Sequence, residues 1–201
     1  MTSSPALPLT ELVPTAAALD VGESCVFLGS GISRRAGRST IGRALTVRTG
    51  AGDNLALHRA VAAAGPGDVL VVSCPGPPVG LAGEVICTAL LARGVRGLVT
   101  DSGVRDHDAL VELGFPVWSA EIVPRGTTKH EPGEVGGSVE MSGSVVRTGD
   151  VVLADSDGVV CVPAADWTHV RERAVAKERK ESDWLDELRQ GTRLEALTRL
   201  L

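Results

Sequence analysis

Two short segments of the chain carry the residue types best suited to chemistry. The first is Gly83-Glu84-Val85-Ile86, near the start of a predicted helix, and the second is Asp101–Asp106, directly after a predicted strand. The unpaired N–H groups of a first helical turn, aided by the helix dipole, form a seat for a carboxylate. Glycine at position 83 allows a ligand to approach the backbone closely. Residues 83–86 are therefore candidate substrate-binding residues.

The second segment ends in Arg105 and Asp106, which suit binding of an anion and of a metal ion. The guanidinium of arginine is a planar donor fork that matches a carboxylate. Aspartate is a hard oxygen ligand for Mg²⁺, which commonly takes one or two protein carboxylates and keeps its waters. A cation and an arginine together could hold a 2-oxo acid. Purely structural roles stay open for the same residues. Arg105 and Asp106 could form an exposed ion pair, and Glu84 could be a favourable acidic residue in the first turn of the helix.

The elements that position these segments alternate between strands and helices. Residues 69–73 are a continuous apolar run that follows a turn at 65–68, which is typical of a strand covered on both faces. The elements predicted after it are a helix at 82–93, a strand at 97–100, a short helix at 107–113 and a strand at 115–119. This order implies parallel strands with right-handed crossovers. Ligands gather at the carboxyl ends of such strands.

The flanking sequence completes an α/β domain followed by a helical tail. A strand is predicted at 41–47, a helix at 53–64 capped by Asp53 or Asn54, and strands within 145–154 and 158–163. Of the 24 glycines, only Gly191 follows Gly158, and no proline follows Pro163. We therefore expect an α/β domain over residues 1–163 and a helical tail over residues 164–201, packed on the domain or on a neighbouring subunit. Within the tail, a short last helix is expected at 193–200.

Composition excludes several classes of function. The net charge of −5 repels phosphate backbones, and two Phe, three Trp and no Tyr leave few surfaces on which bases could stack, so no nucleic-acid partner is expected. The chain shows neither a secretory signal nor an apolar run of membrane-spanning length, which favours a cytoplasmic protein without a membrane partner. The four cysteines and four histidines lack the spacing of a metal site or a disulfide framework.

Several blocks of sequence, taken in order over residues 40–163, resemble the RraA-like family. They are Gly50–His58, Gly67–Val72, Gly83-Glu84, Gly94–Asp106, Phe115–Val117 and Gly149–Val160. This family contains the regulators of ribonuclease activity A and the class II 4-hydroxy-4-methyl-2-oxoglutarate/4-carboxy-4-hydroxy-2-oxoadipate aldolases. The resemblance implies a swivelling α/β/β/α sandwich. It also implies assembly into a homotrimer or homohexamer, with the site at the subunit interface.

For the aldolase members, the resemblance implies roles for the residues already selected. Asp106 would bind a divalent metal, Mg²⁺ or Mn²⁺, Arg105 would contact the substrate, and residues 83–86 would donate N–H groups to its carboxylate. The activity implied is that of a metal-dependent carbon–carbon lyase. It would cleave a short 2-oxo (dicarboxylic) acid to pyruvate through a metal-stabilised enolate, as an aldolase or an oxaloacetate decarboxylase. Arg105 and Glu84 would be catalytic, with Glu84 holding the water that acts as base.

Two further expectations follow from the same comparison of residues. Lys129, Lys177 and Lys180 are separated in sequence from both segments, so no Schiff base is expected. The alternative function is a non-catalytic regulator of the RraA type, an acidic ring that binds and inhibits a ribonuclease or another protein partner. Residues 164–201 carry equal numbers of acidic and basic residues, so the net charge of −5 belongs wholly to the part before them.

Overall fold

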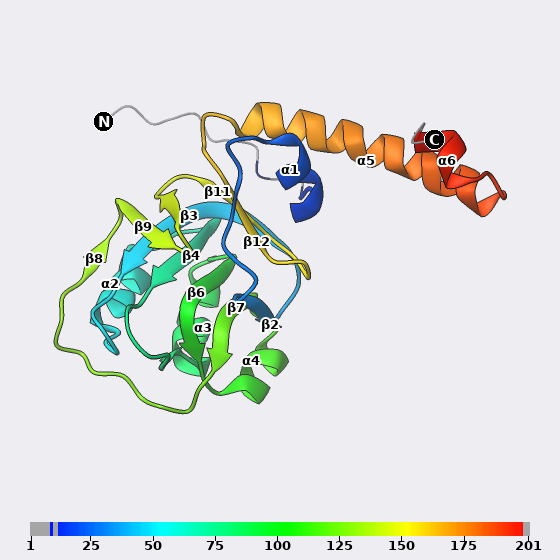
Figure 1. The fold of residues 1–201 in the computed structure, drawn as a ribbon. Coiled ribbons are helices and arrows are strands. Elements are labelled where there is room, and N and C mark those ends of the chain that lie inside the picture. The colour runs from blue at the N-terminus through cyan, green and yellow to red at the C-terminus, as the bar shows by residue number, and fades with distance from the viewer. Residues whose placement is uncertain (1–8, 10–11, 199–201) are drawn as a thin grey trace.

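A ten-stranded sheet lies at the centre of the protein in the computed structural model, which describes residue 9 and residues 12–198 (Figure 1). Four parallel strands form its middle, in the order β3 (Thr40–Arg48), β4 (Asp68–Ser73), β6 (Gly97–Val104) and β7 (Val117–Ile122). The helices α2 (Leu55–Ala63), α3 (Glu84–Ala92) and α4 (His107–Leu113) connect these strands. The predicted parallel arrangement is therefore confirmed.

Antiparallel strands extend the sheet on both sides. β11 (Val151–Ala154), β12 (Val159–Val162) and β1 (Val26–Phe27) follow β3, while β2 (Ser33–Ala36) pairs with β7 at the other edge. Two short strands are attached at the side, β5 (Gly80–Ala82) on β6 and β8 (Glu134–Val135) on β3. A separate hairpin consists of β9 (Ser138–Met141) and β10 (Ser144–Arg147). The remaining helices are α1 (Thr15–Val21), α5 (Trp167–Arg189) and α6 (Leu194–Thr198).

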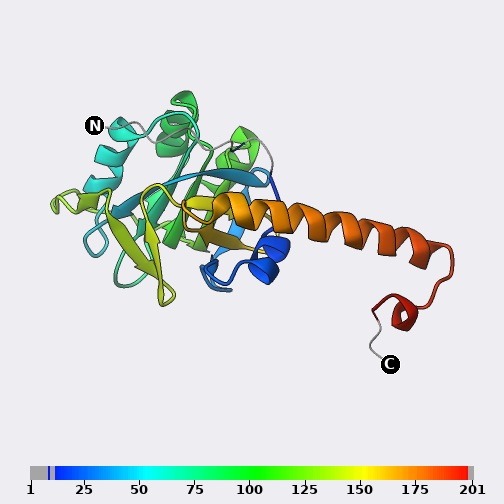
Figure 2. The ribbon, with the colours of Figure 1, turned by 90° about the horizontal axis from the view of Figure 1, so that it is seen from above.

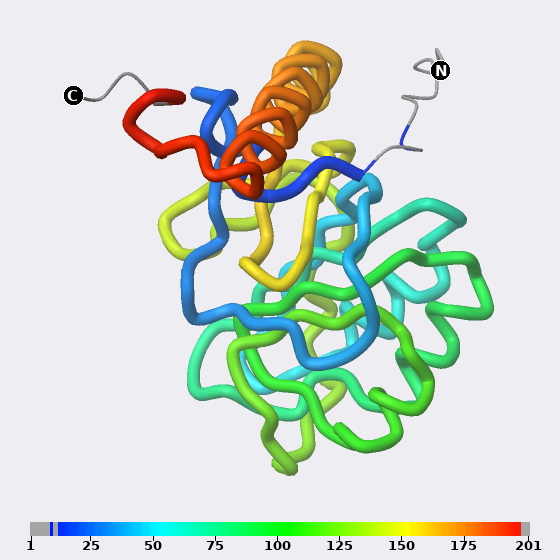
Figure 3. Tube along the Cα trace, turned by 90° about the vertical axis from the view of Figure 1, so that its right-hand side faces the viewer, coloured from blue at the N-terminus to red at the C-terminus, as the bar shows by residue number. Residues whose placement is uncertain are grey.

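Three apolar clusters separate the layers of the fold. The first lies between the parallel strands and α2, α3 and α4, and includes Leu57, Leu70 and Leu90. The second joins the opposite face of these strands to the antiparallel strands, with Val71, Trp118, Val152 and Val159 among its members. The third lies under α1 and α5, where Trp167 packs with Leu153 and Val160. The layers therefore follow the order α/β/β/α, as predicted, and Figure 3 shows α1 and α5 on the side opposite α2, α3 and α4.

The element boundaries near the candidate site differ from those predicted. β6 does not end at Thr100 but continues to Val104, because β5 and the end of β7 pair with it on either side. Residues 101–104, which were expected to follow the strand, are therefore part of it, and Arg105 is the first residue after it. The helix predicted from residue 82 begins at Glu84, since β5 occupies residues 80–82. The short helix at 107–113 is confirmed, and Gly114 ends it in the left-handed conformation.

The C-terminal helix packs on the domain through its first turns only. Trp167, Val170 and Ala174 are buried, whereas Figure 2 shows the rest of α5 extending beyond the sheet. The predicted last helix coincides with α6 as far as Thr198, and its remainder lies outside the described residues, as do residues 1–8 and 10–11 of the predicted domain. Within the described residues, no helix combines the length and the apolar character needed to cross a bilayer.

The two tryptophans of α5 should differ sharply in their contribution to stability. Trp167 is fully buried, so Trp167→Ala should lower the free energy of unfolding by about 3–5 kcal/mol. Trp184 is only partly buried, and the ammonium of Lys180 lies 4.7 Å from its ring centre, so Trp184→Ala should cost about 1 kcal/mol or less. Urea unfolding measures both values. Equal losses would contradict this account of how α5 packs.

Candidate active site

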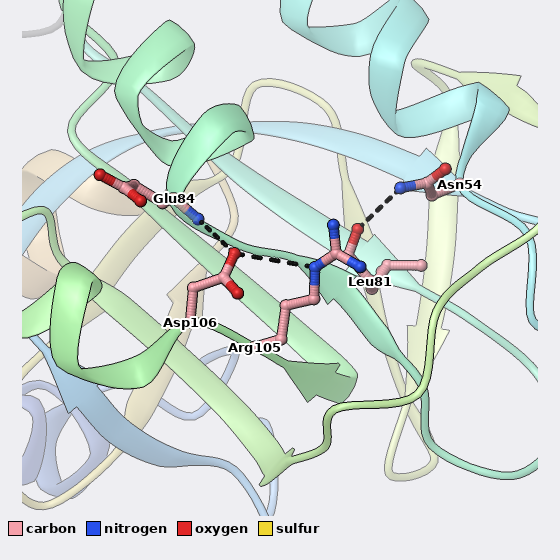
Figure 4. Close-up of polar contacts among 5 residues, drawn as sticks. All are labelled: Asn54, Leu81, Glu84, Arg105 and Asp106. Atoms are coloured by element: carbon pink, nitrogen blue, oxygen red, sulfur yellow. Dashed lines mark hydrogen bonds and ion pairs between the residues drawn. The ribbon is translucent and has the colours of Figure 1, made fainter.

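The ends of β5 and β6 bring the two predicted segments into contact (Figure 4). The backbone N–H of Arg105 donates to the carbonyl of Ala82 over 2.9 Å, which joins the turn after β6 to the turn before α3. The N–H of Glu84 donates to Oδ2 of Asp106 over 3.2 Å, and Nε of Arg105 lies 3.7 Å from the same oxygen. The carboxylate of Asp106 therefore holds the first turn of α3 beside the guanidinium of Arg105.

Asp106 adopts a left-handed backbone conformation, with φ 56° and ψ 41°. This conformation costs a non-glycine residue roughly 1–2 kcal/mol, although aspartate tolerates it better than most. The side chains of Arg105 and Asp106 are 49% and 43% exposed, and an ion pair between exposed groups contributes at most about 1 kcal/mol. The ion pair alone does not offset the strain. The carboxylate of Asp106 also accepts the N–H of Glu84, and its carbonyl accepts the N–H of Leu110 at the start of α4.

Gly83 is required where these elements meet. A Cβ atom at this position would overlap Oδ2 of Asp106 and lie 2.9 Å from Cγ of Arg105. The backbone of Gly83 is extended, with φ −147°, so the requirement comes from the close approach of Asp106 and not from backbone freedom. A side chain here would push the carboxylate away from α3.

A pocket of about 240 Å³ opens beside this contact. It is smaller than the roughly 300–1,000 Å³ of sites for drug-sized ligands, so it suits a small metabolite. The residues that line it are Asn54, His58, Gly80, Leu81, Gly83, Val85, Ile86, Arg105, Asp106, Gly126, Thr127 and Lys129. Asp106 is the only acidic member of this set.

The structure brings together most of the predicted site residues. Gly83, Val85, Ile86, Arg105 and Asp106 all line the pocket. In the described part of the chain, the N–H groups of Val85 and Ile86 donate to no protein acceptor, so they are available to an anion. Glu84 takes part through its backbone, while its exposed carboxylate points away from Asp106 in Figure 4. Its role as the group that holds the base remains a prediction.

Lys129 reaches the pocket from the loop between β7 and β8, which corrects the expectation that the lysines lie away from the site. His58, on α2, lies in the same pocket. Burial and the positive charge of Lys129 lower the pKa of His58 below its ordinary value, so its ring is mostly neutral near pH 7. The pocket therefore has a second basic side. It is formed by α2 and the loop after β7, which lie outside the two segments selected from the sequence.

Asp53 fastens this loop to the start of α2. Its buried carboxylate accepts hydrogen bonds from the hydroxyl of Thr128 and from the backbone N–H groups of Leu55, His130 and Glu131. Burial alone would raise the pKa of Asp53, but these hydrogen bonds outweigh it and the pKa lies well below its ordinary value. No sequence motif identifies Lys129, His58 or Asn54 as residues of the pocket. The only sequence features near them are the helix cap at Asp53 and the polar stretch at 129–131.

The donor set at Asp106 fits a hard divalent cation in part. The described residues contain no group of three or more His, Cys, Asp or Glu side chains arranged as a metal site. Oδ2 of Asp106 is engaged by Glu84 and Arg105, whereas Oδ1 has no protein partner within the described residues. One free carboxylate oxygen suits Mg²⁺ or Mn²⁺, which complete their coordination with water and substrate oxygens.

Comparison with known proteins agrees with the fold and shows the family. A family model described as RraA-like (Aldolase/RraA) matches residues 18–161. A protein of Halalkalibacterium halodurans, provisionally named a 4-hydroxy-4-methyl-2-oxoglutarate aldolase, is 31% identical over 69% of this chain and 66% of its own length. The chain thus spans just under two thirds of that relative.

Two solved structures are similar over most of the chain. The RNA-processing inhibitor RraA from Thermus thermophilus is 26% identical, with a TM-score of 0.70 over 76% of this chain and 94% of that one. An uncharacterised protein from Pseudomonas syringae has a TM-score of 0.82 over 92% of both chains. At 24% identity, this second likeness concerns the fold alone.

Gly83→Ala should disrupt the contact between Asp106 and α3. We expect a loss of stability of about 1–3 kcal/mol, because the added methyl group overlaps the carboxylate in a packed turn. The matched control is Gly31→Ala, since a Cβ there meets no atom within 4 Å. Urea unfolding of both variants checks the difference. A Gly83→Ala protein as stable as the control would refute the close contact.

Asp53→Asn should destabilise the protein in a pH-dependent way. Because the folded pKa of Asp53 is lowered, its contribution is fully present above the unfolded value of about 3.9 and is lost as the pH falls through the folded value. The gap in stability between wild type and Asp53→Asn should therefore stay constant from pH 7 to about pH 4 and shrink progressively as the pH falls further. Asp183→Asn, on the exposed part of α5, is the control. A gap that stays constant below pH 4 would contradict this assignment.

Proposed function

Because the chain belongs to the RraA-like family, we propose that it is a divalent-metal-dependent carbon–carbon lyase that cleaves a short 2-oxo acid to pyruvate. One observation carries the proposal. Arg105, Asp106 and the first turn of α3 line a single small pocket, where an anion site and an oxygen ligand for a cation lie side by side. The provisional aldolase name of the Halalkalibacterium relative supports the same class of reaction.

The carboxylate of the 2-oxo acid would bind between α3 and Arg105. The N–H groups of Val85 and Ile86 offer hydrogen bonds reinforced by the helix dipole. The guanidinium of Arg105 offers a planar pair of donors. Oδ1 of Asp106 would hold the cation, Mg²⁺ or Mn²⁺, which when bound supplies Lewis-acid stabilisation of negative charge on the keto oxygen.

The chain's own residues would then handle charge and protons during cleavage. In a retro-aldol reaction, a base removes the proton of the C4 hydroxyl, the C3–C4 bond breaks, and its electron pair forms the enolate of pyruvate, which is protonated at C3. Arg105 is placed to stabilise the developing negative charge. We assign the base to a water held by Glu84, whose exposed side chain must rotate toward the pocket to reach it. Decarboxylation of a 2-oxo diacid passes through the same enolate.

A regulatory role is the second candidate, favoured by the likeness to the RNA-processing inhibitor RraA of Thermus thermophilus. In that case, the acidic domain would bind a basic protein partner and the pocket would be dispensable. An Arg105→Ala, Asp106→Ala double variant would then retain full partner inhibition, and no 2-oxo acid would be turned over. The two candidates are thus separated by the dependence of activity on the pocket.

Asp106→Asn tests the enzymatic proposal. The substitution keeps a residue that tolerates the left-handed backbone, so the fold should persist, while the loss of the anionic ligand should lower pyruvate release by about 100-fold or more. Asp108→Asn is the matched control, because Asp108 is fully exposed and only two residues away. A lactate dehydrogenase-coupled assay with and without EDTA measures the effect. Pyruvate release that survives EDTA or the Asp106→Asn substitution would reject the proposal.

A further inference from the structure

Asn54 lies at the start of α2, but helix capping does not explain its side chain. It occupies the N-cap position, yet its amide caps no backbone N–H, and Oδ1 of Asp53 instead accepts from the N–H of Leu55 over 2.8 Å. Asn54 is 5% exposed, and its Oδ1 atom is buried without a hydrogen-bond partner within the described residues. Burial of an unpartnered polar atom destabilises a fold. Neither capping nor stability therefore accounts for an asparagine at this position.

The amide nitrogen of Asn54 has a definite partner, the carbonyl of Leu81. Nδ2 donates to this carbonyl over 3.0 Å, in a buried hydrogen bond that Figure 4 shows beside Arg105. Leu81 belongs to β5, and the carbonyl of the next residue, Ala82, accepts the N–H of Arg105 over 2.9 Å. The amide thus joins α2 to the short strand that leads into Gly83 and the first turn of α3. The donor of the amide, and not its oxygen, explains the asparagine.

The backbone of Asn54 binds the other wall of the pocket. Its N–H donates to the carbonyl of Thr128, in the loop after β7, over 3.0 Å. Leu81 lines the pocket on the β5 side, and Thr127 and Lys129 line it on the loop side. Asn54 therefore contacts both walls, the loop through its backbone and β5 through its side chain. It is placed to fix the distance between them.

A second link joins the same two walls through backbone groups alone. The N–H of Gly80 donates to the carbonyl of Arg125 over 2.8 Å. This bond involves no side chain, so it should persist in variants of Asn54 and keep β5 attached to the loop. Loss of the Asn54 amide should then shift the end of β5 locally, and the protein should stay folded.

We propose that Asn54 is a positioning residue of the site, whose amide holds the turn before α3 in the geometry that binds an anion. Backbone N–H groups form an effective anion site only if they are held in place before the ligand binds. The effect on a ligand passes through the carbonyl of Leu81, because Nδ2 is engaged there and Oδ1 is buried. The inference rests on the proposed lyase function for its kinetic test, and a binding test makes it independent of turnover.

The first test compares Asn54→Ala with Arg59→Ala. Arg59, also on α2, donates from Nη1 to the carbonyl of Pro132 over 3.0 Å, and Pro132 lies outside the set of residues that line the pocket. Each variant therefore loses one hydrogen bond from a side chain of the same helix to a backbone carbonyl. We expect Asn54→Ala to lower kcat/KM for 4-hydroxy-2-oxoglutarate by about tenfold or more, and Arg59→Ala to change it by about twofold or less.

Asn54→Asp separates positioning from a loss of stability. The introduced carboxylate repels the carbonyl of Leu81, whereas its protonated form can donate to that carbonyl as the amide does. Burial raises the pKa of a carboxyl group, so protonation falls in a range where the protein is folded. As the pH falls from 8 to 5, kcat/KM of Asn54→Asp relative to Asn54→Ala should rise by about fivefold or more. Circular dichroism at each pH checks that both variants are folded.

Other charged groups around Asn54 are the same in both variants, so their titration cancels in this ratio. They are Asp53 beside it, His58 on α2, Lys129 on the loop, and Arg105 and Asp106 after β6. The pKa of His58 is lowered by burial and by Lys129, so its protonation within this pH range is the main effect that the ratio removes.

Calorimetry with oxalate in the presence of Mg²⁺ repeats these comparisons without turnover. Asn54→Ala should bind oxalate about tenfold more weakly than wild type and Arg59→Ala should bind it equally well, with the same recovery of Asn54→Asp at low pH. If wild type cleaves no 2-oxo acid but this order of affinities holds, the lyase function is rejected and the positioning role is supported. The inference is overturned if Asn54→Ala matches Arg59→Ala in either measurement, if the ratio does not change with pH, or if wild type binds no oxalate.

Discussion

The hydrogen bond from the N–H of Glu84 to the carboxylate of Asp106 is the contact on which the site depends. It links the start of α3 to the turn after β6, and it requires both a left-handed backbone at Asp106 and the absence of a side chain at Gly83. Because one carboxylate oxygen is used in this contact, the second is free of protein partners among the described residues. In the proposed function, this single aspartate would shape the anion site and hold the cation.

The fold makes this contact possible by placing two strand ends side by side. β4 and β6 run parallel, and β5 adds to β6 just before α3, so both turns emerge at the same edge. The antiparallel strands, α1 and α5 pack behind the opposite face and contribute none of the pocket residues. The pocket therefore lies on one side of the sheet, and α1 and α5 lie on the other.

The local part of this arrangement could be predicted from the sequence. Apolar runs and glycine stops located β4, α4 and the parallel order of the strands, and residues 83–86, Arg105 and Asp106 lie near the carboxyl ends of these strands. The non-local part could not. β6 continues past Thr100 only because β5 and β7 pair with it, and a strand edge of this kind has no signature in its own residues. Lys129 enters the pocket because the carboxylate of Asp53 binds the backbone of a loop far along the chain, and backbone N–H groups carry no sequence pattern.

Binding of oxalate tests the central claim most directly, because oxalate is a planar dianion that resembles the enolate of pyruvate and is not turned over. Isothermal titration calorimetry should be run on wild type and Asp106→Asn, each with Mg²⁺ and with EDTA. If Asp106 holds the cation beside the anion seat at α3, oxalate should bind wild type tightly in Mg²⁺, at least tenfold more weakly in EDTA, and weakly to Asp106→Asn under both conditions. Oxalate affinity that is the same in Mg²⁺ and EDTA, or that is unchanged in Asp106→Asn, would contradict the account.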